Sequence, residues 1–298
     1  MANPSTTRKK TSGKPASTGW SPHTPSVDLD APTSKRRRAP DDTDEAESHD
    51  GAQDGDRIAK VIARAGVCSR RDAEKLIAAG SVTLDGKTVT TPATKVGAGQ
   101  VVSVDGKPLA EPAPARLWRY HKPAGLVTTH HDPKDRPTVF ANLPKHLPRV
   151  VSIGRLDYNS EGLLLLTNDG EIARRLELPV GGWPRQYRAR LFGKVTQSDL
   201  DKLAEGVTID GVKYGPVVAD IERSRGMYSW ATVTLKEGKN REIKRLMESL
   251  GLKVARLIRV QFGPFHLGQL PEGGVEEIPA RIWREQLSIG RKKHAKDA

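Results

Sequence analysis

Three side chains that could take part in catalysis, Arg155, Asp157 and Glu161, lie between two apolar stretches. The stretches at residues 150–153 and 163–166 predict strands, which would hold both ends of the intervening loop and fix its polar side chains. Two carboxylates in one loop are typical of a glycosidase or of a hydrolase that releases a base. Alternatively, Asp157 is a turn former that bonds its own backbone amides.

Two further candidates lie downstream, a tyrosine and a cation. Tyr187 falls in the strand pattern of residues 186–192, where a tyrosine usually serves as half-buried packing. Residues 240–250 predict a helix that Asn240 would cap, with Lys244 on the face opposite its apolar stripe. A cation near the start of such a helix can pair with a buried carboxylate, and the alternative is a solvated basic face.

A metal site is a further interpretation of the polar loop that contains His130, His131 and Asp132. Adjacent residues on a loop seldom converge on one ion, and the sequence has no second cluster of histidines or cysteines to complete the ligand set. We therefore expect no metal.

The composition predicts a basic protein with a polyanionic partner. The 298 residues include 49 lysines and arginines against 36 acidic residues, a formal net charge of +13. Such an excess favours nucleic acid as the partner. The single cysteine, Cys68, excludes an intramolecular disulfide and fits a reducing cytoplasm. Because no apolar run reaches the ~18 residues of a membrane span, we expect a cytoplasmic protein that does not enter a membrane.

The elements that must position these side chains fall between two polar tails. Residues 1–55 are rich in serine, threonine and proline and nearly neutral, which predicts a disordered tail, and residues 291–298 predict a short basic one. We predict a small domain at residues 56–115 and a larger catalytic domain at residues 116–290.

Two short amphipathic helices and two hairpins make up the small domain. Apolar residues recur at helical spacing over residues 58–65 and again after Ser69, which is placed to cap the second helix, and Gly80 is placed to end it. Asp85-Gly86 and Asp105-Gly106 predict the hairpin turns. The basic side chains on the outer faces of the helices are Arg57, Lys60, Arg64, Arg70, Arg71 and Lys75.

This small domain resembles an S4 RNA-binding domain, most specifically in the turn Cys68-Ser-Arg-Arg-Asp-Ala73. The resemblance implies that the basic helices dock on structured RNA and contact its backbone and shape more than its base edges. An ordinary helix pair with solvated charges is the alternative.

The larger domain resembles the pseudouridine synthases of the RsuA/RluA type. Gly154-Arg-Leu-Asp157, the following Gly162-Leu-Leu-Leu165 and the turn Lys122-Pro-Ala-Gly125 carry the resemblance. Together with the S4 module they indicate the RsuA/RluB branch, and residues 240–245 and 254–263 look closer to its large-subunit, RluB-like members.

The resemblance implies a role for each of the catalytic candidates. Asp157 would be the catalytic aspartate of the family. Tyr187 would stack on the uracil and could assist removal of the C5 proton. Lys244 would hold the aspartate ionised, as a point charge where relatives have arginine or lysine.

Three arginines would contact the RNA. Arg155 would help to extrude the target nucleotide or hold its phosphate, since a base must leave the stack to be reached. Arg241 and Arg245, on the predicted helix, are candidates for phosphate contacts.

The remaining pattern predicts an α+β fold with a largely antiparallel mixed sheet and flanking helices. Strands are expected at residues 117–121 and 126–129, on either side of the turn at Lys122, and in the C-terminal half up to residue 262. Arg256 and Arg259 are expected on the basic surface.

We predict a monomeric enzyme that isomerises a specific uridine of ribosomal RNA, in 23S rRNA or a large-subunit precursor, without a cofactor. The reaction moves the uracil from N1 to C5 and needs no water, redox step or metal. One carboxylate can start it, as a nucleophile or as a base. The alternatives are a non-catalytic S4 protein of ribosome assembly and specificity for 16S rRNA.

Overall fold

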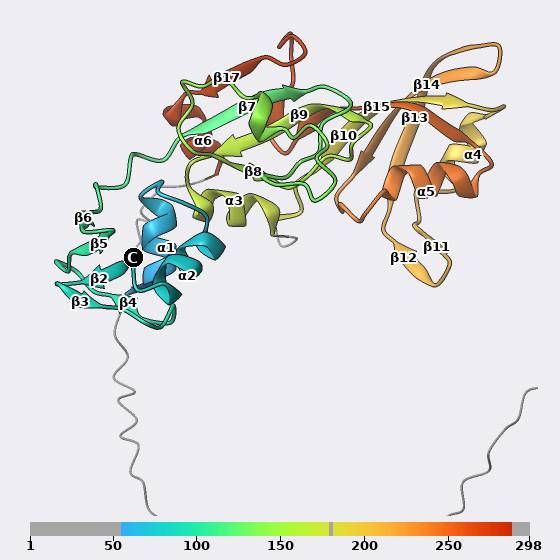
Figure 1. Cartoon of the computed structure of the whole chain (residues 1–298). Coiled ribbons are helices and arrows are strands. Elements are labelled where there is room, and N and C mark those ends of the chain that lie inside the picture. Colours follow the sequence, from blue (N-terminus) through green and yellow to red (C-terminus); the bar gives the residue numbers. More distant parts are fainter. Residues whose placement is uncertain (1–54, 179–180, 288–298) are drawn as a thin grey trace, which may run out of the picture. The chain divides into compact units, whose positions relative to one another are not determined.

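The computed structural model describes residues 55–178 and 181–287 (Figure 1). The predicted tails at residues 1–55 and 291–298 lie outside the described residues, apart from Gly55. The described part has the predicted α+β class, with two short helices and small sheets followed by one large mixed sheet.

Residues 56–108 contain the two predicted helices and small strands, with a hydrophobic cluster of their own. Ser69 caps the second helix, because its Oγ accepts from the amide of Asp72 at 3.1 Å. Ile58, Ile62 and Ile77 have no exposed surface and form the centre of the small core. The elements are β1 (Asp56–Arg57), α1 (Ile58–Arg64), α2 (Arg70–Ala78), β2 (Val82–Leu84), β3 (Lys87–Thr88), β4 (Lys95–Val96), β5 (Val102–Val104) and β6 (Lys107–Pro108).

Both predicted hairpins are present in the four-stranded sheet β3-β2-β5-β6. Asp85 turns β2 into β3 and Asp105 turns β5 into β6, each with a φ of +49° and each followed by a glycine of positive φ. Two successive residues of positive φ are what a type I′ turn requires.

One nine-stranded sheet runs through residues 117–278, in the order β13-β14-β10-β15-β9-β7-β17, with β8 on β9 and β16 on β15. The pair β9–β15 is parallel and the other pairs are antiparallel, as predicted for a largely antiparallel sheet. Its strands are β7 (Leu117–Lys122), β8 (Val151–Ile153), β9 (Ser160–Thr167), β10 (Arg185–Phe192), β13 (Val217–Arg225), β14 (Tyr228–Leu235), β15 (Lys253–Phe262), β16 (Phe265–His266) and β17 (Val275–Ile278).

Apolar side chains cover both faces of the sheet at β9, which is buried throughout its length. Leu164 and Leu166 belong to the hydrophobic cluster that includes the apolar face of α5, whereas Leu163 and Leu165 belong to the cluster that includes α3 and α6. A strand buried on both faces reads as a continuous apolar run. The remaining elements are η1 (Phe140–Asn142), α3 (Gly170–Glu177), α4 (Gln197–Asp201), β11 (Val207–Ile209), β12 (Val212–Tyr214), α5 (Glu242–Ser249) and α6 (Ala280–Gln286).

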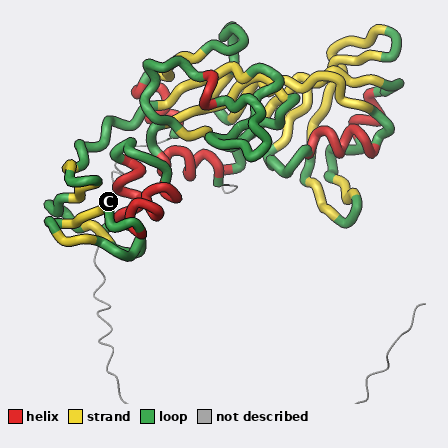
Figure 2. Tube along the Cα trace, in the orientation of Figure 1, coloured by secondary structure: helices red, strands yellow, loops and turns green. Residues whose placement is uncertain are grey.

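The prediction of a strand at residues 126–129 was wrong. This segment is loop, with a single bridge between Val127 and Thr138. Figure 2 shows such loops in green, beside the yellow strands of the sheet. Thr129 N turns back to the carbonyl of Val127 at 3.0 Å, which ends the extended conformation. Thr128 uses its hydroxyl to bond the backbone of Leu156. The β-branched residues therefore brace a loop instead of joining the sheet.

Candidate active site

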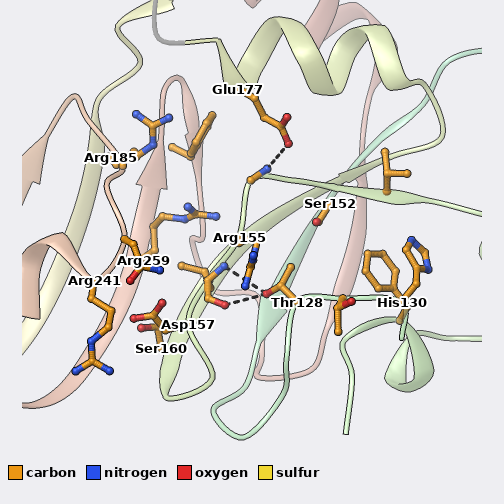
Figure 3. Close-up of a pocket in the computed structure, with 18 of the residues that line it drawn as sticks. Thr128, His130, Ser152, Arg155, Asp157, Ser160, Glu177, Arg185, Arg241 and Arg259 are labelled. Carbon is orange, nitrogen blue, oxygen red and sulfur yellow. Dashed lines mark hydrogen bonds between the residues drawn. The ribbon is translucent and has the colours of Figure 1, made fainter. Parts of the chain in front are cut away.

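A cleft of about 1160 Å³ lies beside the loop that joins β8 to β9 (Figure 3). That loop, β10, β15, the start of α5 and the loop that follows β7 contribute to its lining. These segments are distant in sequence, and the sheet order β10-β15-β9-β7 brings them together. The structure places the three predicted catalytic residues, Asp157, Tyr187 and Lys244, in this cleft.

Hydrogen bonds hold the Asp157 loop on two sides, as the dashed lines in Figure 3 show. Thr128 Oγ1 donates to the carbonyl of Leu156 at 2.9 Å and accepts from its amide at 3.3 Å. Glu177 Oε1 accepts from the amide of Gly154 at 2.7 Å. Asp157 is therefore held by a braced loop, which is what a precisely positioned site needs.

Lys244 places an ammonium beside the Asp157 carboxylate. The distance from Nζ to Oδ2 is 3.3 Å. The Lys244 side chain is 14% exposed and that of Asp157 34% exposed. Because the pair is partly shielded from water, its attraction is stronger than that of an open surface pair. The helix α5 thus places a positive charge beside the Asp157 carboxylate.

A second lysine, Lys122, is hydrogen-bonded to the backbone where the same loop joins β9. Its side chain is fully buried, and Nζ donates to the carbonyls of Pro123 at 2.8 Å and Ser160 at 2.9 Å. Burial lowers the pKa of this ammonium to about 8, while the carboxylates of Glu161 and Asp157 act in the opposite direction. Sequence analysis identified Lys122 only as part of a turn, because a lysine at a strand end gives no sign that it is buried.

Glu161 does not share the cleft with Asp157. We expected it on the loop, but β9 begins at Ser160, so Glu161 is part of a buried strand and is only 8% exposed. Its carboxylate accepts from Arg256 Nη2 at 2.6 Å and from Arg256 Nε at 3.0 Å. A carboxylate that accepts two hydrogen bonds from one guanidinium in this way has a structural role. The paired-carboxylate hydrolase therefore lacks its second group in the cleft.

Tyr187 faces Arg259 across the β10–β15 ladder, and both line the cleft. Tyr187 is 9% exposed and Arg259 is 2% exposed, so Arg259 does not lie on the surface as we expected. Its Nε donates to the carbonyl of Leu163 at 2.7 Å, and Nη2 is buried with no partner among the described residues. The burial results from long-range strand pairing, which the sequence around Arg259 does not reveal.

Comparisons with known proteins bear on the family of this chain. Residues 116–249 match the RNA pseudouridylate synthase family and residues 56–102 match the S4 domain. A Rickettsia felis protein named as an uncharacterized RNA pseudouridine synthase is 49% identical over 229 residues, which are 76% of this chain and 98% of that protein. This chain belongs to the RNA pseudouridine synthase family.

Two further relatives refine the family assignment. The ribosomal large subunit pseudouridine synthase B of Pasteurella multocida is 42% identical over 232 residues, 76% of this chain and 67% of that protein. A crystal structure of a pseudouridylate synthase matches with a TM-score of 0.56 and 26% identity, over 78% of this chain and 99% of that one. The predicted RluB-like type of pseudouridine synthase, with its S4 domain, is confirmed.

The synthase presents two of its three predicted phosphate contacts to the cleft. Arg155 and Arg241 line the cleft and are exposed. Arg245 does not line it, and its Nη1 donates to the Tyr214 hydroxyl at 3.3 Å. The neighbours Lys244 and Arg245 point about 100° apart around the axis of α5, so Lys244 lines the cleft and Arg245 does not.

The predicted cap of α5 was wrong, and the residue that begins the helix explains why. Arg241 precedes α5 with a φ of +53°, and the helix starts at Glu242, so Asn240 lies too early to cap it. The buried Glu242 carboxylate instead accepts from the amide of Lys239 at 2.8 Å, and burial raises the pKa of Glu242. Asn240 lines the cleft.

The S4 domain of the synthase carries its predicted basic residues on α1 and α2, except Arg57, which lies in β1 directly before α1. Two of them are paired: Lys60 Nζ lies 2.7 Å from Asp56 Oδ1 and 2.5 Å from Glu171 Oε1, and Lys75 Nζ lies 3.0 Å from Asp72 Oδ1. The exposed members of the set are Arg57, Arg64, Arg70, Arg71 and Lys75.

In the polar loop after β7, two residues considered as metal ligands, Asp132 and His130, contact other side chains of the same loop. Asp132 is buried and its carboxylate accepts from Arg136 Nη2 at 2.7 Å and from Arg136 Nε at 2.9 Å. His130 instead stacks on Phe140. Within residues 55–178 and 181–287, no group of three or more histidine, cysteine, aspartate or glutamate side chains is arranged around a metal position. Of the helices described, none has the length and apolarity to span a membrane.

Proposed function

We propose that this pseudouridine synthase modifies a uridine of 23S rRNA, acting as a cytoplasmic monomer with Asp157 as the catalytic carboxylate and without a cofactor. The observation that carries the proposal is the Asp157–Lys244 pair, with 3.3 Å between Nζ and Oδ2, in a cleft that Tyr187 also lines. The S4 domain and the relative named ribosomal large subunit pseudouridine synthase B support ribosomal RNA as the substrate.

Asp157 starts the reaction in one of two ways. As a nucleophile it attacks C1′ and displaces N1, which forms a covalent sugar intermediate. As a base it removes the C2′ proton, which expels the uracil and leaves a glycal. In both routes the uracil turns and C5 bonds to C1′; this releases the Asp157 carboxylate from C1′ in the first route, and in the second Asp157 returns its proton to C2′. The C5 proton is then lost and N1 gains a proton. Atoms therefore balance without water or an electron carrier.

The other side chains of the cleft position the nucleotide. The Tyr187 ring stacks on the uracil, and its hydroxyl assists removal of the C5 proton. Arg155, exposed on the Asp157 loop, holds the extruded nucleotide or its phosphate, and Arg241 contacts a neighbouring phosphate. Because Arg245 bonds Tyr214 outside the cleft, we assign it no contact with the target nucleotide.

Pseudouridine mapping tests the proposal directly. Ribosomal RNA from cells that lack the protein is treated with carbodiimide and read by primer extension, beside RNA from cells complemented with the wild type. We expect one 23S stop to disappear on deletion and return on complementation. A missing stop in 16S rRNA instead would overturn the subunit assignment, and unchanged stops in all ribosomal RNAs would overturn the substrate.

Replacement of Lys244 by methionine should lower kcat by about 100-fold or more, because the developing charges around Asp157 lose a positioned cation. Lys244→Arg should retain most activity, since it keeps the charge. The matched control is Arg245→Met, on the same helix but outside the cleft, which should leave kcat near the wild-type value. Equal losses in Lys244→Met and Arg245→Met would show that the helix needs charge only for folding or general RNA attraction.

Removal of S4 charges should flatten the salt dependence of RNA binding. Replacing Arg57, Arg70, Arg71 and Lys75 by alanine should reduce the slope of log K against log salt by roughly 3, because fewer counterions are released. Lys60→Ala is the control and should change the slope less, since the Lys60 side chain is 24% exposed and paired with two carboxylates, whereas Lys75 is 80% exposed and its pair with Asp72 is open to water. A fourfold variant with the wild-type slope would show that RNA docks elsewhere.

A further inference from the structure

The loop between β7 and β8 presents a pair of stacked rings to the cleft. The rings of His130 and Phe140 are nearly parallel, at 12°, with centroids 3.5 Å apart, and both residues line the cleft. In Figure 3 the labelled His130 lies on the other side of Asp157 from Arg241. The proposed catalytic roles use neither ring.

The loop fixes these rings relative to Asp157. Thr128, two residues before His130, is bonded through its hydroxyl to the backbone of Leu156, the residue before Asp157. Further along, Thr138 Oγ1 accepts from the amide of Ala141 at 3.2 Å, which holds the turn that carries Phe140. The Asp132–Arg136 ion pair cross-links the part of the loop that lies between His130 and Phe140. The pair is therefore preorganised and not a chance contact of two mobile side chains.

His130 has the properties of a stacking surface. The residue is exposed although Phe140, itself half-buried against the main hydrophobic cluster, covers one ring face. Neither ring nitrogen of His130 has a side-chain hydrogen bond within the part of the chain that the structure describes. Partial desolvation of the ring and the charge of the nearby Arg149 lower the pKa of His130, which favours the neutral imidazole at pH 7. A neutral aromatic ring binds through its face.

RNA supplies the complementary ligand. When the target uridine leaves the stack, its neighbour in the strand loses a stacking partner. Aromatic side chains replace such partners in single-stranded nucleic-acid sites, with little dependence on which base is present. Arg149 and Arg155 line the same cleft as His130 and can hold the phosphates on either side of such a base.

We propose that the His130–Phe140 pair is a stacking platform for the nucleobase adjacent to the target uridine. This inference rests on the proposed function, since it needs an RNA substrate with an extruded uridine. Phe140 serves as a positioning residue that supports the ring of His130 from behind, and His130 contacts the RNA. The platform recognises a base face, so it adds binding energy without selecting one sequence.

A double-mutant cycle between protein and RNA tests the platform. The probe is a short RNA that contains the mapped uridine, prepared intact and with an abasic nucleotide on the 5′ or the 3′ side. Full-length wild type, His130→Ala and His130→Tyr are compared by kcat/KM. His130→Ala should lower kcat/KM about tenfold on intact RNA, and the loss should vanish on one of the abasic RNAs. His130→Tyr should stay near wild type, because it keeps the ring.

The same loss on the intact RNA and on both abasic RNAs would overturn the platform, as would a His130→Tyr variant as weak as His130→Ala. Thermal melting of each variant separates these outcomes from unfolding, and His130→Tyr retains the packing on Phe140. The proposed function fails separately, at the mapping step: if no uridine is modified, both proposals fall, whereas a modified uridine with no coupling overturns only the platform.

Discussion

Replacement of Asp157 by asparagine will abolish pseudouridine formation, with a loss in kcat of about 10⁴-fold or more, which is the scale on which other enzymes lose activity with a catalytic group. Asparagine has the same shape but can neither attack C1′ nor remove a sugar proton. The Leu156 backbone bonds to Thr128 and the Gly154 bond to Glu177 do not involve the replaced group. The loop should therefore keep its position, and the affinity for RNA should remain close to wild type.

Single-turnover assays with excess enzyme will check this result, with RNA affinity measured in parallel. Glu161→Gln is the matched control. It weakens the pair with Arg256 and lowers stability, yet the folded protein should still form pseudouridine, since Glu161 does not line the cleft. An active Asp157→Asn enzyme would refute the catalytic assignment. Release of free uracil that depends on both carboxylates would instead support the hydrolase.

Local sequence patterns predicted the strands that hold the site. The apolar stretches on either side of the Asp157 loop became β8 and β9, and the alternation around Tyr187 became β10. Such patterns succeed because each strand must bury side chains whatever its partners are. The resemblance to pseudouridine synthases added what patterning alone left open, namely that Asp157, Tyr187 and Lys244 belong to one site.

The charged residues whose positions were wrongly predicted or overlooked share a cause, long-range pairing. Glu161 was expected on a loop and Arg259 on the surface, but both lie where β9 runs parallel to β15 in the middle of the sheet. Lys122 was overlooked for the same reason, because its burial depends on loop carbonyls 36 and 38 residues away in the chain. A charged residue contributes a polar signal to any local pattern, and only the folded partners show that it is buried.

The substitution with the largest expected effect on stability is at Gly162, where β9 lies against the backbone of β15. A Cβ built on Gly162 would lie 2.3 Å from the carbonyl oxygen of Arg259 and 2.7 Å from its nitrogen, and Gly162 has a φ of +101°. Both obstructing atoms are backbone atoms of a central strand, so neither can move without separating β9 from β15. Gly162→Ala should therefore lower the free energy of unfolding by about 3 kcal/mol or more, as backbone strain adds to overpacking.

Urea denaturation will measure this change, with Gly154→Ala as the matched control. Gly154 also has a positive φ, of +68°, but a Cβ there would meet no atom within 4 Å. The control therefore carries the backbone strain alone, about 1–2 kcal/mol. If the two variants lose equal stability, the close approach of β9 and β15 is not what requires glycine at residue 162. If Gly162→Ala loses more stability, the contact between β9 and β15 that places the Asp157 loop beside Tyr187 requires a residue without a side chain at position 162.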